Sequence, residues 1–305
     1  MLKEIDASYL LGTIINPLSG YFLCNHYLAS EINPESDDYV DYKHSINIPY
    51  NETDLLTTKD YSVIKNNDII LVQVRYFDLF YNEILPTLGE KKIILITSQW
   101  AYPALSKSKQ TDEVLNHKNI ILWISQNPIY QHKKYMPFPF GINMKDLSLY
   151  YSFLVKFYHE CDEESKCTTS KNINILETNL TVYDWYPENH IRKKYSQFGK
   201  ESPKRIAYIE YLNKLSRSRY IISPQGDRPD CYRNYEALGL GCRPISNLNQ
   251  IYREIFQENL LYASPETMLD YIKTKHIDIN FSVPERQIIL FQFWRDKIIS
   301  KIKQL

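Results

Sequence analysis

The chain has 305 residues, of which 44% are hydrophobic and 24% are charged, a composition typical of a globular protein with one large or two ordinary domains. Lys plus Arg and Asp plus Glu both number 36, so the formal net charge is zero. This balance disfavours a nucleic-acid-binding protein, which needs a broad basic surface, and any anion site must therefore be local.

The N-terminal part of the chain carries little hydrophobic periodicity. Residues 1–60 contain polar runs such as NPESDDYVDYKHS and indicate a domain edge or a partly ordered insertion. The opening segment MLKEIDASYLLGTIINPLSGYFLC is interrupted by charges, Gly and Pro, so it predicts neither a signal peptide nor a membrane span. We therefore expect a cytoplasmic protein without a transmembrane segment. Five scattered cysteines predict free thiols, with a bridge between Cys161 and Cys167 as the alternative.

Three continuous apolar runs of strand length follow, over residues 68–74, 91–98 and 119–125. With a helix predicted over 77–88, they are typical of a parallel sheet that is covered on both faces. Residues 145–170 predict a helix that ends in a charged segment suited to a linker. Ligands bind at the carboxyl ends of parallel strands, so the polar and aromatic residues in the loops after these strands are candidate ligand contacts: Gln99, Trp100, Gln126, Asn127 and His132. A structural role stays open for each of them.

The C-terminal half repeats the alternation of strand and helix. We expect strands over 173–177, 219–223 and 260–263, and helices over 188–198, 203–218, from Ser264 onward and over 284–303. Two successive α/β blocks predict two Rossmann-like domains. The ligand site would then lie in the cleft between the two domains.

Residues 219–246 are the most informative stretch of the chain. A short apolar strand ends in a loop rich in Pro, Gly and Asp, and Asp230 is placed to cap a helix that begins at Cys231. Free amides and the helix dipole at such a helix start favour a phosphate. Arg233 and Glu236 share one helix face, where a cation could meet a diphosphate and a carboxylate could meet ribose hydroxyls. The alternative is an exposed Arg–Glu pair that contributes only a few tenths of a kcal/mol.

The segment SPQGDRPDCYRNYEALGLGCRPI resembles the nucleotide-sugar-binding motif of exostosin-like glycosyltransferases of the GT-B fold, in which Ser-Pro-x-Gly precedes an Arg-x-x-Glu-Ala-Leu helix and then Gly-Cys-x-Pro-Ile. Upstream, WISQN at 123–127 followed by PFPFGI at 137–142 is similar to the end of the acceptor domain in this group. Asn179-Leu-Thr followed by Arg192 resembles a donor-domain segment that contributes a basic residue near the diphosphate.

The resemblance implies an α/β, GT-B architecture of two Rossmann-like domains facing across a cleft. The expected parts are an acceptor-binding domain over 1–150, a linker over 151–170, a nucleotide-sugar-binding domain over 171–283 and a C-terminal helix over 284–305 that can pack back on the first domain.

Roles for individual residues follow from the same resemblance. Glu236 would hydrogen-bond the ribose, Arg233 and the loop amides around Ser223 and Gly226 would meet the diphosphate or the sugar, and Arg192 would be a second phosphate cation. The full set expected to bind the nucleotide sugar is Arg192, Ser223, Pro224, Gly226, Asp230, Arg233 and Glu236. The set expected to bind the acceptor is Gln99, Trp100, Gln126 and Asn127.

The implied activity is the transfer of a sugar from a UDP- or GDP-sugar to a glycan or glycoconjugate acceptor. We expect no cofactor and no metal, because a helix dipole and basic side chains can stabilise the departing nucleotide and no Asp-x-Asp motif lies in a suitable loop. If the reaction inverts the anomeric centre, Asp78 is the first candidate base and His132 the second. Asp78 could equally be the N-cap of the helix that follows.

Two other function classes compete with this interpretation. A non-catalytic carbohydrate- or nucleotide-binding protein on the same fold stays open, because the base is the least constrained residue. A nicotinamide-dependent oxidoreductase is disfavoured, because no G-x-G-x-x-G follows an early strand.

Overall fold

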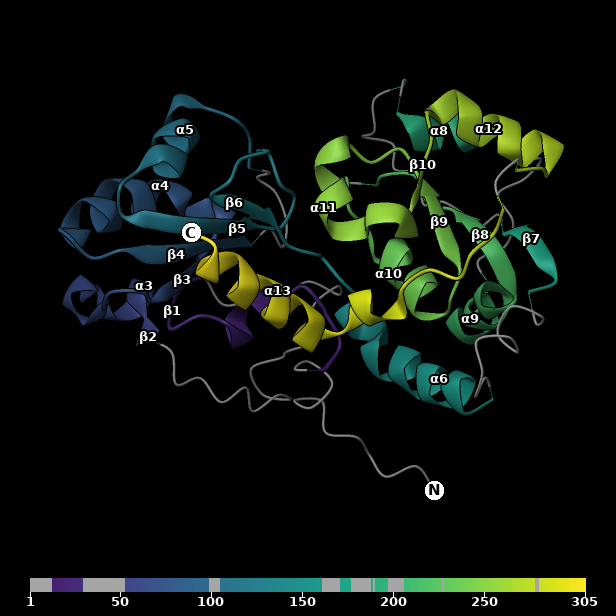
Figure 1. Cartoon of the computed structure of the whole chain (residues 1–305), viewed down its shortest axis with the longest axis horizontal. Helices are drawn as coiled ribbons and strands as arrows, with labels where there is room; N and C mark the ends of the chain where they lie inside the picture. Colours follow the sequence, from purple (N-terminus) through teal and green to yellow (C-terminus); the bar gives the residue numbers. More distant parts are fainter. Residues whose placement is uncertain are drawn as a thin grey trace. The chain divides into compact units, whose positions relative to one another are not determined.

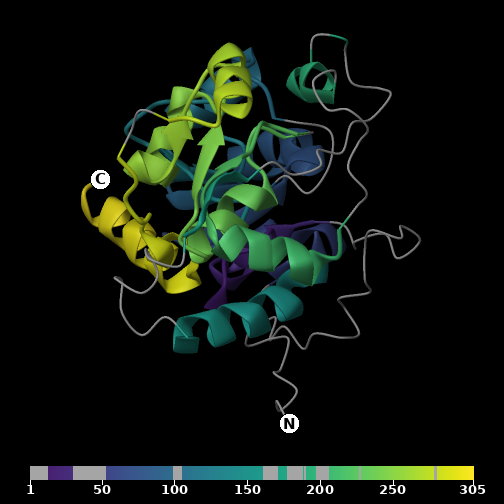
Figure 2. The same ribbon diagram turned by 90° about the vertical axis from the view of Figure 1, so that its right-hand side faces the viewer.

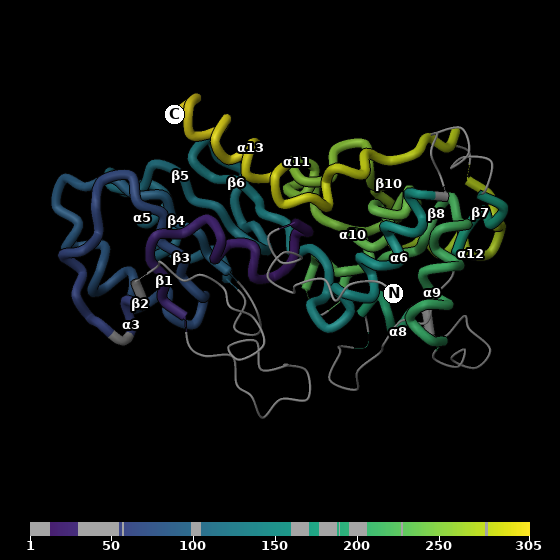
Figure 3. The backbone as a smooth tube through the Cα atoms, turned by 90° about the horizontal axis from the view of Figure 1, so that it is seen from below, coloured from purple at the N-terminus to yellow at the C-terminus, as the bar shows by residue number. Residues whose placement is uncertain are grey.

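The computed structural model describes residues 13–29, 53–98, 105–160, 171–176, 188, 190–196, 206–226, 228–277 and 280–305. The chain divides into two compact units, which we call unit 1 (Met1–Lys145 with Leu290–Leu305) and unit 2 (Asp146–Ile289). The tube in Figure 3 follows the chain from unit 1 into unit 2 and back into the yellow C-terminal helix α13 (Phe291–Lys303). Each unit contains a parallel sheet and helices (Figure 1). The prediction of an α/β protein is confirmed.

Unit 1 contains a six-stranded sheet in which every adjacent pair of strands is parallel. In spatial order its strands are β2 (Thr53–Asp54), β1 (His26–Leu28), β3 (Ile69–Gln73), β4 (Ile93–Ser98), β5 (Ile120–Ser125) and β6 (Tyr135–Pro137). The three predicted apolar runs correspond to β3, β4 and β5, and every residue of β4 is buried. Continuous burial of this kind is what makes a strand of a covered parallel sheet apolar along its whole length.

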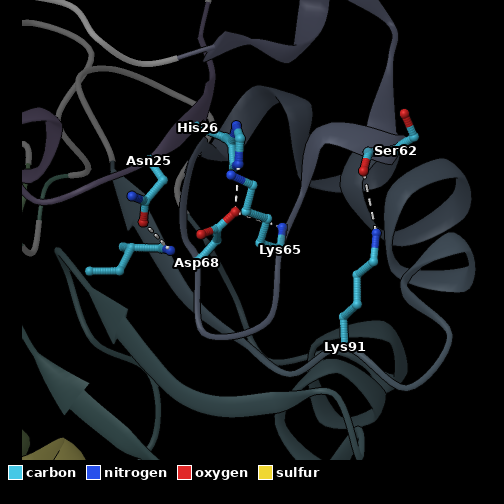
Figure 4. Close-up of polar contacts among 7 residues, drawn as sticks. Asn25, His26, Ser62, Lys65, Asp68 and Lys91 are labelled. Atoms are coloured by element: carbon cyan, nitrogen blue, oxygen red, sulfur yellow. Dashed lines mark hydrogen bonds and ion pairs between the residues drawn. The ribbon is translucent and has the colours of Figure 1, made fainter.

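The N-terminal part of the chain supplies β1 and β2, which the sequence did not predict. Polar side chains hold β1 beside β3 at the amino ends of the two strands (Figure 4). His26 Nε2 hydrogen-bonds Asp68 Oδ2 at 2.8 Å, and Asn25 Oδ1 accepts from the amide of Ile69 at 2.9 Å. A strand of three residues has few ladder hydrogen bonds of its own, so these contacts help to fix its position.

The segment after β3 differs from the single helix expected over 77–88. It is a series of short turns: a 3-10 helix (Val74–Tyr76), α4 (Phe77–Leu79), a π-helix (Phe80–Ile84) and a second 3-10 helix (Leu85–Leu88). Pro86 has no N–H to donate to the carbonyl of residue 82, so a regular α-helix cannot continue through it. The wider π turn immediately before this proline accommodates the break.

The other helical segments of unit 1 surround the same sheet. They are a 3-10 helix (Ser19–Phe22), α3 (Leu55–Thr58), a 3-10 helix (Tyr61–Val63), α5 (Lys109–Asn116) and α13, with a further 3-10 turn (Met144–Asp146) at the unit boundary. The terminal helix, expected from residue 284, begins at Phe291. It packs within unit 1, where Trp294 lies edge-on to Phe138 with ring centroids 6.3 Å apart.

Unit 2 contains a four-stranded parallel sheet. Its spatial order is β10 (Leu261–Tyr262), β9 (Arg243–Ser246), β8 (Ser218–Ile222) and β7 (Ile173–Leu176). Its helical segments are α6 (Leu147–Glu160), α8 (Ile191–Ser196), α9 (Tyr208–Ser216), α10 (Tyr232–Gly239), a 3-10 helix (Gln250–Tyr252), α11 (Arg253–Phe256), a 3-10 helix (Gln257–Asn259), α12 (Pro265–Thr274) and a 3-10 helix (Arg286–Ile289). α6 and α9 lie side by side (Figures 1 and 2).

Two details of unit 2 bear on the sequence predictions. α6 runs through the first part of the segment expected as a linker, and residues 161–170 lie outside the described residues. α12 begins as predicted: Ser264 is its N-cap and accepts a hydrogen bond from the amide of Thr267, with Pro265 in the first turn. No helix within the described ranges is both long and apolar enough to cross a bilayer.

Candidate functional site

The segment from β8 to α10 was the strongest candidate in the sequence. Its predicted order of strand, loop and helix is confirmed, because β8 ends at Ile222 and α10 begins at Tyr232. The helix cap differs from the prediction. Cys231 is the N-cap of α10, and it makes no side-chain capping bond. Asp230, predicted as the N-cap, is buried and its carboxylate accepts instead from Tyr235 Oη and from Asn234 Nδ2, the latter at 3.3 Å. Asp230 therefore fixes side chains of the first helical turns rather than the amides at the helix start.

Ser223 extends this polar network to the end of β8. Its Oγ donates to Asn234 Oδ1 at 2.7 Å, and its amide donates to the carbonyl of Ile245 in β9 at 2.8 Å. Ser223, Asp230 and Asn234 are all buried. Buried polar groups that satisfy one another hold a single arrangement, so this network fixes the positions of Ser223 and Asp230.

Arg192 of α8 lies against the tip of the same loop. Its Nε donates to the carbonyl of Gln225 at 3.1 Å. A Cβ atom at Gly226 would stand 2.5 Å from Arg192 Nη2, so the missing side chain at this position allows the guanidinium to approach the backbone. The structure thus brings together two residues, Arg192 and Gly226, that the resemblance placed at one diphosphate.

The loop amides, in contrast, are already bonded within the protein. The amide of Gln225 donates to Asn247 Oδ1 and the amide of Gly226 donates to the carbonyl of Arg228, each at 3.0 Å. The amide of Ser223 is likewise bonded to β9. An anion at this loop would therefore be met by cationic side chains rather than by these three amides. Pro224, which has no N–H, is buried next to them.

Glu236 is buried, with 6% of its surface exposed. The alternative interpretation, in which it forms an exposed surface pair with Arg233, is therefore wrong. Its Oε1 accepts from Tyr208 Oη and its Oε2 from Tyr211 Oη, each at 2.9 Å. Burial raises the pKa of Glu236, while the two tyrosine hydrogen bonds and the charge of Arg233 act in the opposite direction.

Several residues of this region were missed in the sequence. They are Tyr208, Tyr211, Asn234, Tyr235 and Asn247. The two tyrosines are three positions apart on α9, which places them on one helix face, but 28 and 25 positions separate them from Glu236. No local pattern joins residues on separate helices, whereas Asn234 lay inside the recognised motif and could have been found as a polar residue on the buried face of α10.

Of the four candidate acceptor residues, the structure describes Gln126 and Asn127. Gln126 is buried, and its Nε2 donates to the carbonyls of Pro17 at 3.3 Å and Pro139 at 3.5 Å. Asn127 is buried and has a left-handed backbone with φ of 54°, a conformation that Asn adopts more readily than most residues. Gln99 and Trp100 lie outside the described residues.

The two candidate bases lie in different environments. Asp78 is exposed in α4, which leaves the carboxyl end of β3. Its alternative role as the helix N-cap is wrong, because Tyr76 is the N-cap of α4. His132 comes just before β6, and its Nδ1 accepts from the amide of Lys134 at 3.2 Å. The carbonyl of His132 also accepts from the amide of Tyr135 at 3.0 Å in the turn that leads into β6, and its role as a ligand contact or second base stays a prediction.

Two further features concern metal and thiol chemistry. Within the described ranges, no group of three or more His, Cys, Asp or Glu could hold a metal ion. Cys24, Cys231 and Cys242 are free thiols, whereas Cys161 and Cys167 lie outside the described residues.

No protein-family model matches the chain, and no curated protein matches its sequence. Among solved structures, the chain is similar to an α1,3-fucosyltransferase, with a TM-score of 0.40 and 11% sequence identity over 98% of this chain and 96% of that one. A likeness at this level does not assign a fold family or an activity.

Proposed function

We propose that the protein is a glycosyltransferase of GT-B type that moves a sugar from a UDP- or GDP-sugar to a glycan or glycoconjugate acceptor. The observation that carries the proposal is the position of Arg192, whose guanidinium lies on the loop at the start of α10, against Gly226. A cation beside a glycine-containing turn at a helix start is suited to a diphosphate. The motif resemblance of residues 223–245 supports the same assignment.

Departure of the nucleotide would be assisted by charge in unit 2. As the bond from sugar to diphosphate breaks, negative charge grows on the leaving phosphate oxygens. Arg192, Arg233 and the positive end of α10 would stabilise that charge without a metal ion. Metal independence is therefore part of the proposal, and transfer that EDTA abolishes and Mn²⁺ restores would contradict it.

The acceptor would be activated in unit 1. In an inverting reaction the acceptor hydroxyl loses its proton to a base as its oxygen attacks the anomeric carbon. We assign this base to Asp78, because the carboxylate is exposed and leaves the carboxyl end of β3, the sheet edge where ligands of α/β proteins bind. Glu236 would accept hydrogen bonds from the ribose of the donor.

A non-catalytic nucleotide- or carbohydrate-binding protein is the second candidate. One observation favours it: Asp78 makes no hydrogen bond with any other described residue, so nothing in the described structure orients it as a base. Donor binding in unit 2 would be common to both candidates. Only turnover separates them.

The experiment measures donor binding and then transfer. Thermal unfolding of the wild-type protein would be followed with UDP, GDP and their sugar conjugates, because a ligand that binds only the folded state raises its apparent stability with concentration. Arg192→Ala should weaken the response by about tenfold in Kd. Arg217→Ala is the matched control: this exposed arginine precedes β8 at the opposite edge of the sheet and should leave the response unchanged.

The outcomes separate the candidates. No shift with any nucleotide, or equal shifts in the wild type and Arg192→Ala, would overturn the assignment of the site. If a donor binds, its hydrolysis or transfer with a panel of acceptor glycans identifies a transferase. Binding of the same donor without either reaction identifies the non-catalytic protein.

A further inference from the structure

The strongest feature outside the proposed phosphate contacts is a carboxylate held by two phenols. Tyr208 and Tyr211 stand on one face of α9, with ring centroids 5.9 Å apart. Each donates to a different oxygen of Glu236 on α10, at 2.9 Å. The two oxygens of one carboxylate are thus fixed separately by one helix.

The backbone beneath Glu236 is fixed as well. Tyr150 of α6, which is fully buried, donates from its Oη to the carbonyl of Glu236 at 3.2 Å and lies 3.4 Å from the carbonyl of Tyr235. α6 and α9 therefore both contact Glu236 of α10, α9 through two tyrosine hydroxyls on the carboxylate and α6 through one on the backbone carbonyl. Little freedom remains for the carboxylate to rotate.

Each oxygen of Glu236 keeps acceptor capacity. An ionised carboxylate offers about four acceptor positions, and the two tyrosines use one on each oxygen. One acceptor position remains on each oxygen, which is the number that two neighbouring hydroxyl donors would need. A purely structural link between α9 and α10 would not require this arrangement, because apolar side chains join helices without the desolvation cost of a buried carboxylate.

We propose that Tyr208 and Tyr211 are positioning residues, which fix the two oxygens of Glu236 so that each accepts from one hydroxyl of a vicinal diol, the ribose of the nucleotide donor. This inference rests on the proposed function, because it takes the donor to be a ribonucleotide. It adds that recognition of the ribose depends on residues of α9 that do not themselves touch the ligand.

The electrostatic surroundings of Glu236 give a readout that a structural link would not move. The groups that face it are Tyr208 and Tyr211 on α9, Arg233 on its own helix, Tyr150 on α6, and Asp146. The tyrosine hydrogen bonds lower the pKa of Glu236 against the effect of burial. Removal of either hydroxyl should therefore raise the pKa of Glu236. When the solution is acidified, the variant should then lose nucleotide affinity at a higher pH than the wild type does.

The test compares ribose hydroxyls with their deoxy analogues. Calorimetry would give Kd for the nucleoside diphosphate that binds best, UDP or GDP, and for its 2′-deoxy and 3′-deoxy forms. In the wild type each missing hydroxyl should weaken binding about tenfold. In Tyr208→Phe and in Tyr211→Phe, the ratio of the Kd of a deoxy form to the Kd of the ribonucleotide should fall severalfold for the 2′ position, the 3′ position or both. The pH at which nucleotide affinity is lost should also be higher than in the wild type. Tyr262→Phe is the control, since this buried hydroxyl has no hydrogen-bond partner among the described residues.

The possible results separate the positioning role of the two tyrosines from the proposed function. Failure of the wild type to bind either nucleotide overturns the proposed function, and the inference with it. If the wild type binds but does not discriminate deoxy forms, or if both phenylalanine variants keep the wild-type ratios and pH profile, the inference alone is overturned. Should a phenylalanine variant fail to fold, Glu236→Gln provides the second measurement: it keeps partners for both tyrosines, and it must lose discrimination for the positioning role to stand.

Discussion

The segments that follow β3 in unit 1 and β8 in unit 2 differ in how they place a carboxylate. In unit 1 the chain passes from β3 directly into short helical turns, and the first carboxylate there, that of Asp78, is exposed without a hydrogen bond to another described residue. In unit 2 the chain leaves β8 through a polar loop, and the carboxylate that precedes α10, that of Asp230, is buried and bonded to Asn234 and Tyr235. The carboxylate after β3 is therefore exposed to solvent, whereas the carboxylate after β8 is buried.

This difference matches two kinds of chemical task. Groups that hold a ligand work best when their own positions are fixed in advance by supporting hydrogen bonds. A general base must instead reach the proton that it removes, so its carboxylate has to be accessible. The enclosed network of unit 2 fits the first task and the exposed carboxylate of unit 1 fits the second. If this contrast holds, substitutions at the two sites should differ in their effects on turnover, stability and donor affinity.

The largest expected effect is on turnover. Asp78→Asn should reduce sugar transfer by about 10²- to 10⁴-fold, because the amide cannot accept the acceptor proton, while donor affinity and stability stay unchanged. Steady-state transfer assays with calorimetry of donor binding would measure both quantities. Glu83→Gln, in the same helical run, is the matched control, because the new amide oxygen can keep the hydrogen bond that Glu83 accepts from Tyr61 Oη at 3.2 Å. Unaltered turnover in Asp78→Asn would remove it as the base.

The second prediction concerns stability. Asp230→Ala should lower the free energy of unfolding by about 2–4 kcal/mol, because it removes the buried carboxylate that accepts hydrogen bonds from Asn234 and Tyr235. Asp78→Ala, at the exposed carboxylate after β3, should change it by less than about 0.5 kcal/mol. Urea unfolding of both variants measures the contrast. Equal effects would mean that the two carboxylates do not differ in the way the contacts indicate.

The strands of the fold were largely predictable. β3, β4 and β5 are largely apolar runs whose residues identify them without tertiary information, because both faces of each strand are covered. In β8 the apolar, buried residues are Tyr220, Ile221 and Ile222. β1 and β2 were not predictable. They have three and two residues, too few for a periodic pattern, and pairing with distant segments decides their existence.

The site was predictable only where its residues are neighbours in sequence. Arg233 and Glu236 fell on one helix, and their motif led to Arg192 by resemblance. The partners of Glu236 could not be found, because they stand on another helix and only the folded chain brings the hydroxyls of Tyr208 and Tyr211 to its carboxylate. Asp230 was assigned a capping role from local pattern, but buried side-chain donors on α10 compete successfully with the helix amides for its oxygens.

The third prediction concerns pH and the buried carboxylate of unit 2. Burial raises the folded-state pKa of Glu236 above its ordinary value of 4.5, so the folded protein holds this proton more tightly than the unfolded chain does. The stability that follows is present at low pH and is lost as pH rises through the folded-state pKa. Glu236→Gln does not titrate, so the wild type should lose stability relative to this variant across the weakly acidic range.

Urea unfolding of the wild type and Glu236→Gln at several pH values from about 4 to 7 would measure that difference. A wild type that instead gains stability relative to the variant as pH rises would show that the tyrosines and Arg233 outweigh burial. Such a result would contradict the direction stated for the pKa of Glu236.

The last prediction concerns Gly226→Ala, which should change stability little. Gly226 is not among the residues with positive φ, so the backbone tolerates alanine, but the new Cβ would stand 2.5 Å from Arg192 Nη2. The guanidinium is the movable end of a flexible side chain, so it should shift away and give up its bond to Gln225. Loss of that hydrogen bond and the lower entropy of the unfolded chain nearly cancel, and stability should change by less than about 1 kcal/mol.

Donor affinity should fall more, by about tenfold, because the displaced Arg192 no longer meets the diphosphate. A double-mutant cycle with Arg192→Ala tests the cause: once the arginine is absent, Gly226→Ala should have no further effect on affinity. If the two losses add instead, Gly226 would act through its own backbone. Arg192 would then not depend on the loop for its position, and the loop after β8 would lose the contact that identifies it as the proposed donor site.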